Sequence, residues 1–422
     1  MNLKSLTVTA TALAIALSLS TGPAKAQSRT RYKVVDLGTL GGSNSQAFGL
    51  SVLGQVAGTS TTSEDATAHA FLWSNGKIHD LGNLPGGSTS GAAAVNILGQ
   101  VVGESDNAQT DPNPFLCFTP NECRAFVWQN GTMRDLGALR GGHNSAAGWA
   151  NDLGLVVGAS ETTTAIDPVN GVPPFHATAW IVGVPVDLGT LGGPLSSANS
   201  VNLFGQVTGI SQFNSVIDPD LGGPFFHAFL VDRGRILDLS SAGGLGGNQS
   251  EGLSINNRRQ VVGDADLAGN SAFHAFLWQS GVMTDLGAVE SDTFSSAQSI
   301  DDLSRVVGWS GDGEEIFRAV IWKNGEATDL NTLVPADTDL YLLVATGINA
   351  SGAIIGFGVS QSTGELHGYL LQPKVNPSAA LATEAEPDAT IAKSPVRVKL
   401  PQSLKRKLRP LPIPVMRRSP QM

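Results

Sequence analysis

The segment Tyr32-Lys-Val-Val-Asp-Leu-Gly38 is one part of a three-part repeat, but it stands at the opposite end of the chain from the unit that lacks this part. Three short phrases each occur seven times, as variants of D-L-G, G-Q-V-V-G and H-A-F-L-W. The D-L-G phrases begin at Asp36, Asp80, Asp135, Asp187, Asp238, Asp285 and Asp329. The G-Q-V-V-G phrases end at Gly58, Gly103, Gly158, Gly209, Gly263, Gly308 and Gly356. No D-L-G follows the last H-A-F-L-W phrase, so seven complete units exist only if residues 32–38 join the last unit.

Each unit supplies four strands. In the second unit, residues 92–96, 100–103, 124–128 and 132–136 are short apolar or β-branched runs separated by turn signals. A period of about 45–55 residues is typical of propellers, solenoids and arrays. The sequence predicts an all-β, seven-bladed β-propeller of four-stranded blades over residues 27–373, closed by the N-terminal strand pairing into the last blade. A parallel β-solenoid shares the glycine richness but leaves the displaced first strand unexplained.

The N-terminal segment, residues 1–26, has the composition of a secretory signal peptide. Lys4 precedes an apolar stretch over residues 6–19, and Ala24-Lys-Ala26 is an A-x-A cleavage site. We therefore expect a secreted or periplasmic protein. No other stretch approaches about 18 uninterrupted apolar residues, so no transmembrane anchor is predicted.

Two cysteines, Cys117 and Cys123, fall in one predicted loop. Export to an oxidising compartment favours a disulfide between them. A metal pair or a redox couple is the alternative, but five residues separate the thiols and the spacing is not C-x-x-C.

Charge is divided unevenly along the chain. The tail, residues 374–422, holds ten basic and three acidic residues, whereas residues 27–373 hold 14 basic and 33 acidic residues, a net charge of −19. Nucleic acid is therefore excluded as a partner of the ring, because phosphate binding needs a basic face. Eight prolines and the basic clusters at 405–409 and 417–418 predict that this tail is disordered. Three roles are open for it: it is solvated, it binds an anionic envelope polymer or lipid, or it folds back on the acidic ring.

The combined phrases resemble the HAF-type bacterial extracellular repeat family. The resemblance is fullest in residues 94–103, in His274-Ala-Phe-Leu-Trp278 and in Asp36-Leu-Gly-Thr-Leu-Gly-Gly42, and it covers about residues 31–373. It implies export and a repeated β architecture, and it implies no particular reaction.

The first residue of the third strand is a hydrogen-bond donor in every unit: His69, Arg124, His176, His227, His274, Arg318 and His367. One residue per blade places them about 10 Å or more apart, so they cannot share one metal. Arginine donates hydrogen bonds but is no ordinary metal ligand or proton shuttle. We therefore expect a structural hydrogen bond, to a backbone carbonyl or to the Asp of D-L-G.

Three consecutive units carry long insertions between the second and third strands. The separations between the two phrases are 11, 21, 18, 18, 11, 10 and 11 residues, so blades two to four would raise a rim on one face. Each insertion (104–115, 161–171 and 212–222) contains an Asp-Pro step, which suits a turn. The sharper reading is a carbohydrate or Ca²⁺ site, with no other cofactor required, that uses Asp111, Asp167, Asp218, Asp220, Phe115, Phe175, Phe225 and Phe226.

Every repeated polar residue has an explanation in the fold, and no nucleophile, base and orienting group can be placed together. The sequence therefore predicts a monomeric, non-enzymatic binding or scaffold module of the bacterial envelope or exterior, with a protein or polysaccharide ligand on the loops of blades two to four. The alternative is a polysaccharide hydrolase or lyase, which as a glycosidase needs two carboxylates about 5–9.5 Å apart across a cleft.

Overall fold

The computed structural model describes residues 32–113, 117, 119–217, 223–312 and 317–374. Within these residues the chain is all-β, with 28 strands, two short 3-10 helices (Ser63–Asp65 and Leu330–Leu333) and no α-helix. The predicted signal peptide and most of the predicted tail lie outside the described residues. No helix in the described part is long and apolar enough to cross a membrane.

Five sheets are four-stranded and antiparallel, and each is built from consecutive strands in chain order. Their strands are β6 (Ser90–Val95), β7 (Val101–Thr110), β8 (Asn121–Gln129), β9 (Thr132–Asp135), β10 (Ser145–Ala150), β11 (Val156–Glu161), β12 (Phe175–Ile181), β13 (Val184–Gly189), β14 (Ser196–Val201), β15 (Val207–Ile217), β16 (Pro224–Asp232), β17 (Arg235–Asp238), β18 (Gly246–Ile255), β19 (Val261–Leu267), β20 (Phe273–Gln279), β21 (Val282–Asp285), β22 (Phe294–Ile300), β23 (Val306–Gly311), β24 (Phe317–Lys323) and β25 (Glu326–Asp329).

The remaining eight strands form one mixed sheet that brings the two ends of the repeat region together. Its strands are β1 (Tyr32–Asp36), β2 (Gly41–Leu50), β3 (Val56–Thr62), β4 (Ala68–Ser74), β5 (Lys77–Asp80), β26 (Leu340–Ile348), β27 (Ile354–Ser360) and β28 (Leu366–Pro373). Its two antiparallel halves, β2–β5 and β26–β28 with β1, are joined by a single parallel bridge between Asn44 and Leu366.

The repeated phrases have direct structural causes. The last glycine of G-Q-V-V-G lies where the second strand meets a carbonyl oxygen of the first strand. A Cβ built on this glycine would lie 1.8–2.0 Å from that oxygen in all seven repeats, so no larger residue fits. The third strand is buried along consecutive residues, as Ala70, Phe71 and Leu72 show, because neighbouring sheets cover both of its faces.

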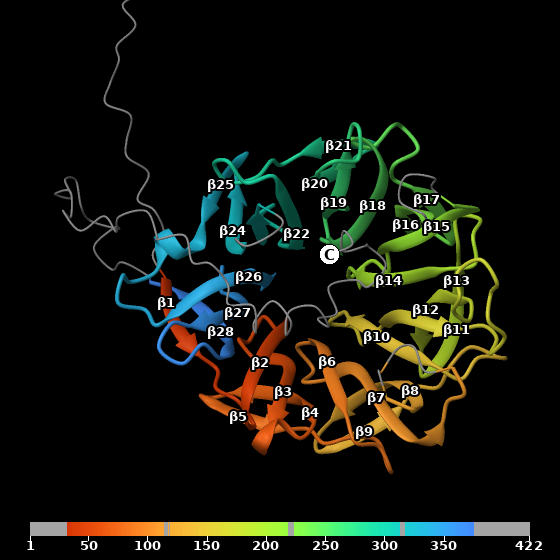
Figure 1. The fold of residues 1–422 in the computed structure, drawn as a ribbon, viewed down its shortest axis with the longest axis horizontal. Coiled ribbons are helices and arrows are strands. Elements are labelled where there is room, and N and C mark those ends of the chain that lie inside the picture. The colour runs from red at the N-terminus through yellow and green to blue at the C-terminus, as the bar shows by residue number, and fades with distance from the viewer. Residues whose placement is uncertain (1–31, 114–116, 118, 218–222, 313–316, 375–422) are drawn as a thin grey trace, which may run out of the picture.

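Figure 1 shows the sheets side by side around the middle of the molecule, which is a propeller-like arrangement. The strands β2, β6, β10, β14, β22 and β26 lie nearest the middle, and β1 lies at the outer edge. Each sheet contacts the next through its second strand and the neighbour's first strand, as in β3 with β6 and β7 with β10. The first and last repeats are also in contact, because β2 contacts β26, β27 and β28.

A serine at the start of the first strand joins neighbouring sheets. Ser90 Oγ donates to Gly82 O (2.6 Å) and accepts from Ala70 N (2.8 Å), and Ser145, Ser196 and Ser295 make the same two bonds at later junctions. Ser45 makes them between the two ends of the repeat region, where it donates to Gly38 O (2.6 Å) and accepts from Gly368 N (3.0 Å).

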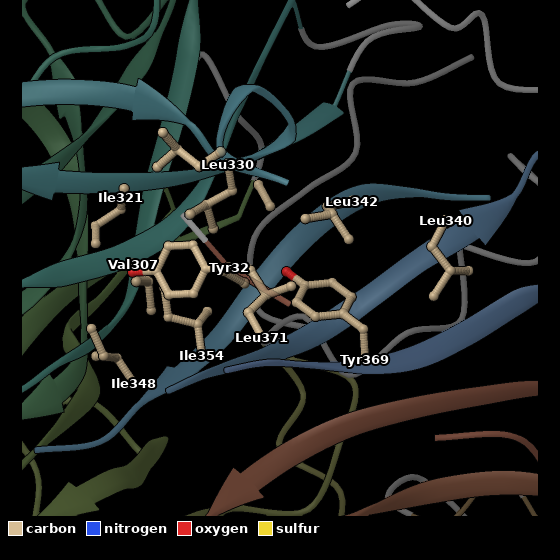
Figure 2. Close-up of a cluster of buried hydrophobic side chains, with 13 residues drawn as sticks. Tyr32, Val307, Ile321, Leu330, Leu340, Leu342, Ile348, Ile354, Tyr369 and Leu371 are labelled. Carbon is tan, nitrogen blue, oxygen red and sulfur yellow. The ribbon is translucent and has the colours of Figure 1, made fainter. Parts of the chain in front are cut away.

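The displaced first strand pairs with the last. β1 runs antiparallel to β28, from Tyr32 opposite Pro373 to Asp36 opposite Tyr369. Figure 2 shows Tyr32 inside a hydrophobic cluster that includes Ile321 and Tyr369, so this strand packs against the neighbouring sheet as well as pairing with its own. The pairing expected from the sequence is present.

Candidate functional site

The third-strand donors contact the aspartates of D-L-G. In five repeats the histidine Nδ1 lies 2.8–3.0 Å from the carboxylate, in the pairs His69–Asp80, His176–Asp187, His227–Asp238, His274–Asp285 and His367–Asp36. The arginines lie farther from theirs, at 3.9 Å for Arg124–Asp135 and 3.7 Å for Arg318–Asp329. Each pair stays within its own repeat, so the donors do not converge on one site.

The pair His367–Asp36 differs because it joins β28 to β1. The hydrogen bond to Asp36 raises the pKa of His367, against the opposing effect of burial. Burial acts to raise the pKa of Asp36, but the hydrogen bonds from His367 and Gly38 N outweigh it and lower that pKa. Both shifts favour the charged pair.

On the opposite ends of the strands, an asparagine links one turn to the next. Each residue of this asparagine chain donates through Nδ2 to a carbonyl oxygen in the next sheet's turn, at 2.9–3.1 Å. The links run from Asn96 to Asn151, Asn151 to Asn202, Asn202 to Asn256, Asn256 to Asp301 and Asn349 to Ser51. Arg305 takes this role for Asp301 by donating to Asn349 O (3.2 Å). This asparagine chain was not predicted, although the asparagine that recurs before G-Q-V-V-G is a sequence signal for it.

The long insertions are partly strand. β7 continues through Thr110, and Thr110 pairs with Asn121, while β15 continues to Ile217, which pairs with Pro224. Much of the first and third insertions therefore extends existing hairpins and does not form loops. The predicted disulfide between Cys117 and Cys123 is confirmed, and it leaves no free cysteine. We call the connections β7–β8, β11–β12 and β15–β16 the long-loop rim.

Two of the predicted ligand aspartates are bound by the protein itself. Asp111 is buried, and it accepts from Asn144 Nδ2 (2.7 Å) and Asn113 N (2.9 Å). Asp167 accepts from Val169 N (3.0 Å) and Asn170 N (2.8 Å), the pattern of a turn. These contacts agree with the prediction that the Asp-Pro steps form turns.

The predicted aromatic residues are mostly covered. Phe175 and Phe226 are buried together with Leu195 and Ile210 between neighbouring sheets, so packing accounts for both rings. Phe225 is half-buried. Phe115, Asp218 and Asp220 lie outside the described residues, so the structure does not bring the predicted set together.

A buried polar network fastens the first rim connection to the next sheet. Asn144 donates through Nδ2 to both Asp111 (2.7 Å) and Glu161 (2.8 Å). Glu122 accepts from Arg124 (2.9 Å) and lies 3.2 Å from His143 Nδ1. Hydrogen bonds of this kind between separate stretches help to fix the geometry of the elements they join. It has no sequence signal, because its members come from four separate stretches.

A shallow pocket of about 220 Å³ lies beside this network, on the side of β6–β9. Its lining is half apolar and half polar: Leu84, Pro85, Ala108, Asn107, Gln109 and Asp135. Ala108 and Gln109 are exposed. The loop at Gly86 packs closely against Ala108 on one side of the pocket, because a Cβ on Gly86, whose φ is +81°, would lie 2.5 Å from Ala108 Cβ. Amide and carboxylate groups beside short apolar surfaces suit a sugar.

Two other acidic features lie outside the lining of this pocket. Burial raises the pKa of Glu104 to about 7, and Glu104 lies beside Gly91 and Thr59. Glu251 and Asp264, both buried, stand opposite each other on β18 and β19, where Asn199 and Ser296 donate to them. The described residues contain no group of three or more His, Cys, Asp or Glu side chains arranged to hold a metal.

No family model matches this chain, and no curated protein matches it. Among solved structures it is similar to a gluconolactonase of Xanthomonas campestris (9% identity, 82% of this chain and 91% of that chain, TM-score 0.37). It is also similar to a puromycin hydrolase mutant complexed with PGG (12% identity, 80% of this chain and 56% of that chain, TM-score 0.49). A third similar structure is TolB of Acinetobacter baumannii (9% identity, 65% of this chain and 63% of that chain, TM-score 0.35). Identities of 9–12% and TM-scores below 0.5 give this chain no activity, ligand or partner.

Proposed function

We propose that this chain is an exported, non-enzymatic binding module of the bacterial envelope or exterior, whose ligand face is the long-loop rim. The observation that carries the proposal is the pocket beside Gln109 and Asp135, next to a connection held by a disulfide and a buried network. A recognition surface gains affinity when its shape is fixed before the ligand arrives.

The scaffold under this face is a closed ring of seven four-stranded blades. Three observations support the closure: β1 pairs with β28, Ser45 bridges Gly38 and Gly368, and Asn349 donates to Ser51 O. The same serine and asparagine links occur between consecutive blades elsewhere. The resemblance to HAF-type repeats fits an exported scaffold of this kind, because rigid repeats carry specificity in the loops they hold.

The favoured ligand is a polysaccharide. Gln109 offers a side-chain amide, Asp135 offers a carboxylate, and Pro85 and Ala108 offer apolar surface within one small pocket. Asn107 lines the same pocket, but its amide is bonded to Glu122 and to Gln109 N. Catalysis is not favoured at the rim, because Asp106, Asp111, Glu122 and Glu161 all accept hydrogen bonds from the protein.

A glycan array with and without Ca²⁺ tests the proposal, followed by titration of the strongest glycan hit against Gln109→Ala combined with Asp135→Asn. The side-chain amide that Asp135→Asn introduces would keep an acceptor for Gly137 N, which Asp135 Oδ1 binds at 2.7 Å, so the fold should be unaffected. Affinity should fall at least about tenfold, which corresponds to about 1.4 kcal/mol.

The matched control is Asp285→Asn, at the same position of another repeat, with unchanged affinity expected. An array with no glycan hit, or equal affinity in the parent and the pocket variant, would remove the polysaccharide assignment. A Ca²⁺ requirement would restore the metal reading of the Asp-Pro steps.

A further inference from the structure

The turns that join the first and second strands expose large apolar side chains on the face opposite the long-loop rim. Leu53, Leu98, Leu153 and Phe204, which we call the apolar arc, are 52–74% exposed and occupy the same turn position in four consecutive repeats. Val52, Ile97 and Leu203, each one position earlier, are also exposed.

Such residues are unusual in this position. The turns end at Gly54, Gly99, Gly154 and Gly205, all with φ between +71° and +82°, and central turn positions of this kind are normally polar. The turn geometry does not require leucine, because Arg258 stands at the same position between β18 and β19. A repeated apolar surface marks a place of contact more often than a scattered exposed residue does.

The four turns are neighbours in space. Asn96 donates to Asn151 O and Asn151 to Asn202 O, so three successive turns lie within hydrogen-bond reach. A Cβ on Gly49 would lie 2.6 Å from Ala94 Cα, which places the first turn's strand against the second's. The four turns of the apolar arc therefore follow one another along one face, and the series is interrupted at Arg258.

The chain leaves the described structure beside this surface. β28 ends at Pro373, and a Cβ on Gly352 would lie 3.6 Å from Pro373 Cγ. Gly352 belongs to the turn whose Asn349 donates to Ser51 O (3.1 Å), the residue that opens the first turn of the arc. The described structure therefore ends next to the apolar arc and on the same face.

The segment that follows carries matching chemistry. It contains Pro410-Leu-Pro-Ile-Pro-Val-Met416, in which every second residue is a large apolar side chain. Alternating prolines favour an extended polyproline conformation that docks on apolar surfaces at low entropic cost. The basic clusters at 405–409 and 417–418 flank it. A linker of this length spans roughly 30 Å or more, enough to cross the four turns.

We propose that residues 410–416 of the same chain dock on the apolar arc, with Leu411, Ile413 and Val415 against Leu53, Leu98, Leu153 and Phe204. The tail is then an internal ligand of the face opposite the rim. This docking is independent of what the rim binds.

Thiol protection in the full-length protein tests the docking, because both native cysteines are in the disulfide. Leu153→Cys is labelled with a maleimide reagent in two backgrounds: the native tail, and a tail carrying Leu411→Asp, Ile413→Asp and Val415→Asp. Docking at the effective concentration of a tethered segment should slow labelling about tenfold with the native tail only.

Two controls separate docking from charge and from general shielding. Ala379→Asp, Ala380→Asp and Ala382→Asp add the same charges elsewhere in the tail and should leave the protection intact. Arg258→Cys, outside the arc, should label equally fast in both backgrounds. Equal labelling of Leu153→Cys with the native and the substituted tail would overturn the proposal, as would protection that appears only at high protein concentration or with added vesicles.

Discussion

In four of the five histidine–aspartate pairs the histidine is largely covered and the aspartate is exposed, whereas both side chains of His227–Asp238 are covered. Asp36, Asp80, Asp187 and Asp285 keep 43–47% of their side-chain surface exposed, whereas the paired histidines keep less than a quarter. Exposed ion pairs contribute about 0–1 kcal/mol to stability. Each pair therefore stabilises its repeat modestly, and the fold depends on their number.

Replacing one histidine tests this role. His274→Gln keeps a donor near Asp285 and should unfold like the parent, whereas His274→Ala should lower the free energy of unfolding by about 0.5–1.5 kcal/mol. Chemical denaturation of both variants measures the difference. A stoichiometric metal lost from either variant with stability unchanged would contradict a structural role.

The pair His367–Asp36 predicts a pH dependence. A raised histidine pKa stabilises the folded state fully below its unfolded value of 6.5, and this stabilisation is lost as the pH rises through the folded pKa. The lowered pKa of Asp36 stabilises above 3.8 and is lost as the pH falls through its folded value. The difference in unfolding free energy between the parent and His367→Gln should therefore be larger near about pH 6 than near about pH 8.5. An equal difference at both pH values would show that the pair is not charged in the fold.

At this scale the repeated residue types are predictable from the sequence, whereas their partners in other sheets are not. The third-strand donors are recognisable in the sequence, because the histidines and arginines at this position share only the ability to donate a hydrogen bond. Asp111 was not recognisable as buried, because its partner Asn144 belongs to another sheet and no local pattern links the two. Phe175 and Phe226 resemble ligand-binding aromatics in sequence, but two neighbouring sheets cover them.

At the scale of the elements, the strands were predictable and their ends were not. Alternating phrases and turn glycines located four strands per repeat. The insertions were read as loops, because nothing in residues 104–110 or 212–217 shows that the antiparallel pairing continues. Pairing can extend past the buried part of a sheet wherever both strands can supply backbone partners.

The asparagine chain has one gap, and filling it should stabilise the molecule. Ser51 stands where Asn96, Asn151 and Asn202 stand in the following turns, and its shorter side chain makes no bond to Asn96 O among the described contacts. Ser51→Asn should add this link and raise the free energy of unfolding by about 0.5–1.5 kcal/mol. The matched Asn151→Ser should lower it by a similar amount. Denaturation midpoints measure both, and an unchanged Asn151→Ser would show that the chain contributes little.

At the scale of the whole molecule, the short strand β1 contributes strongly to stability because it pairs with the last strand, β28. Deleting residues 31–38 removes Tyr32 and Leu37 from the core and exposes the edge of β28. Burial of two such side chains is worth about 3–6 kcal/mol, and an unpaired edge promotes aggregation. The deletion should therefore melt much earlier than the parent and aggregate, whereas truncation after Lys374 should barely change the melting temperature. The opposite order in a thermal scan would rule out closure through β1.

The pairing of β1 with β28 also sets a time order for folding. His367 and Asp36 are 331 residues apart in the chain, so the first strand to be synthesised meets its partner only after the last one has been made. Contacts between residues this far apart form slowly, because the entropy of the intervening chain must be lost before the contact contributes any stabilising free energy. The earlier sheets can form as their own hairpins emerge, but the joining of the two ends must come last. A transiently unpaired β28 edge is thus a normal stage in the formation of this protein, and the period in which it is exposed is the one in which misassembly is most easily started.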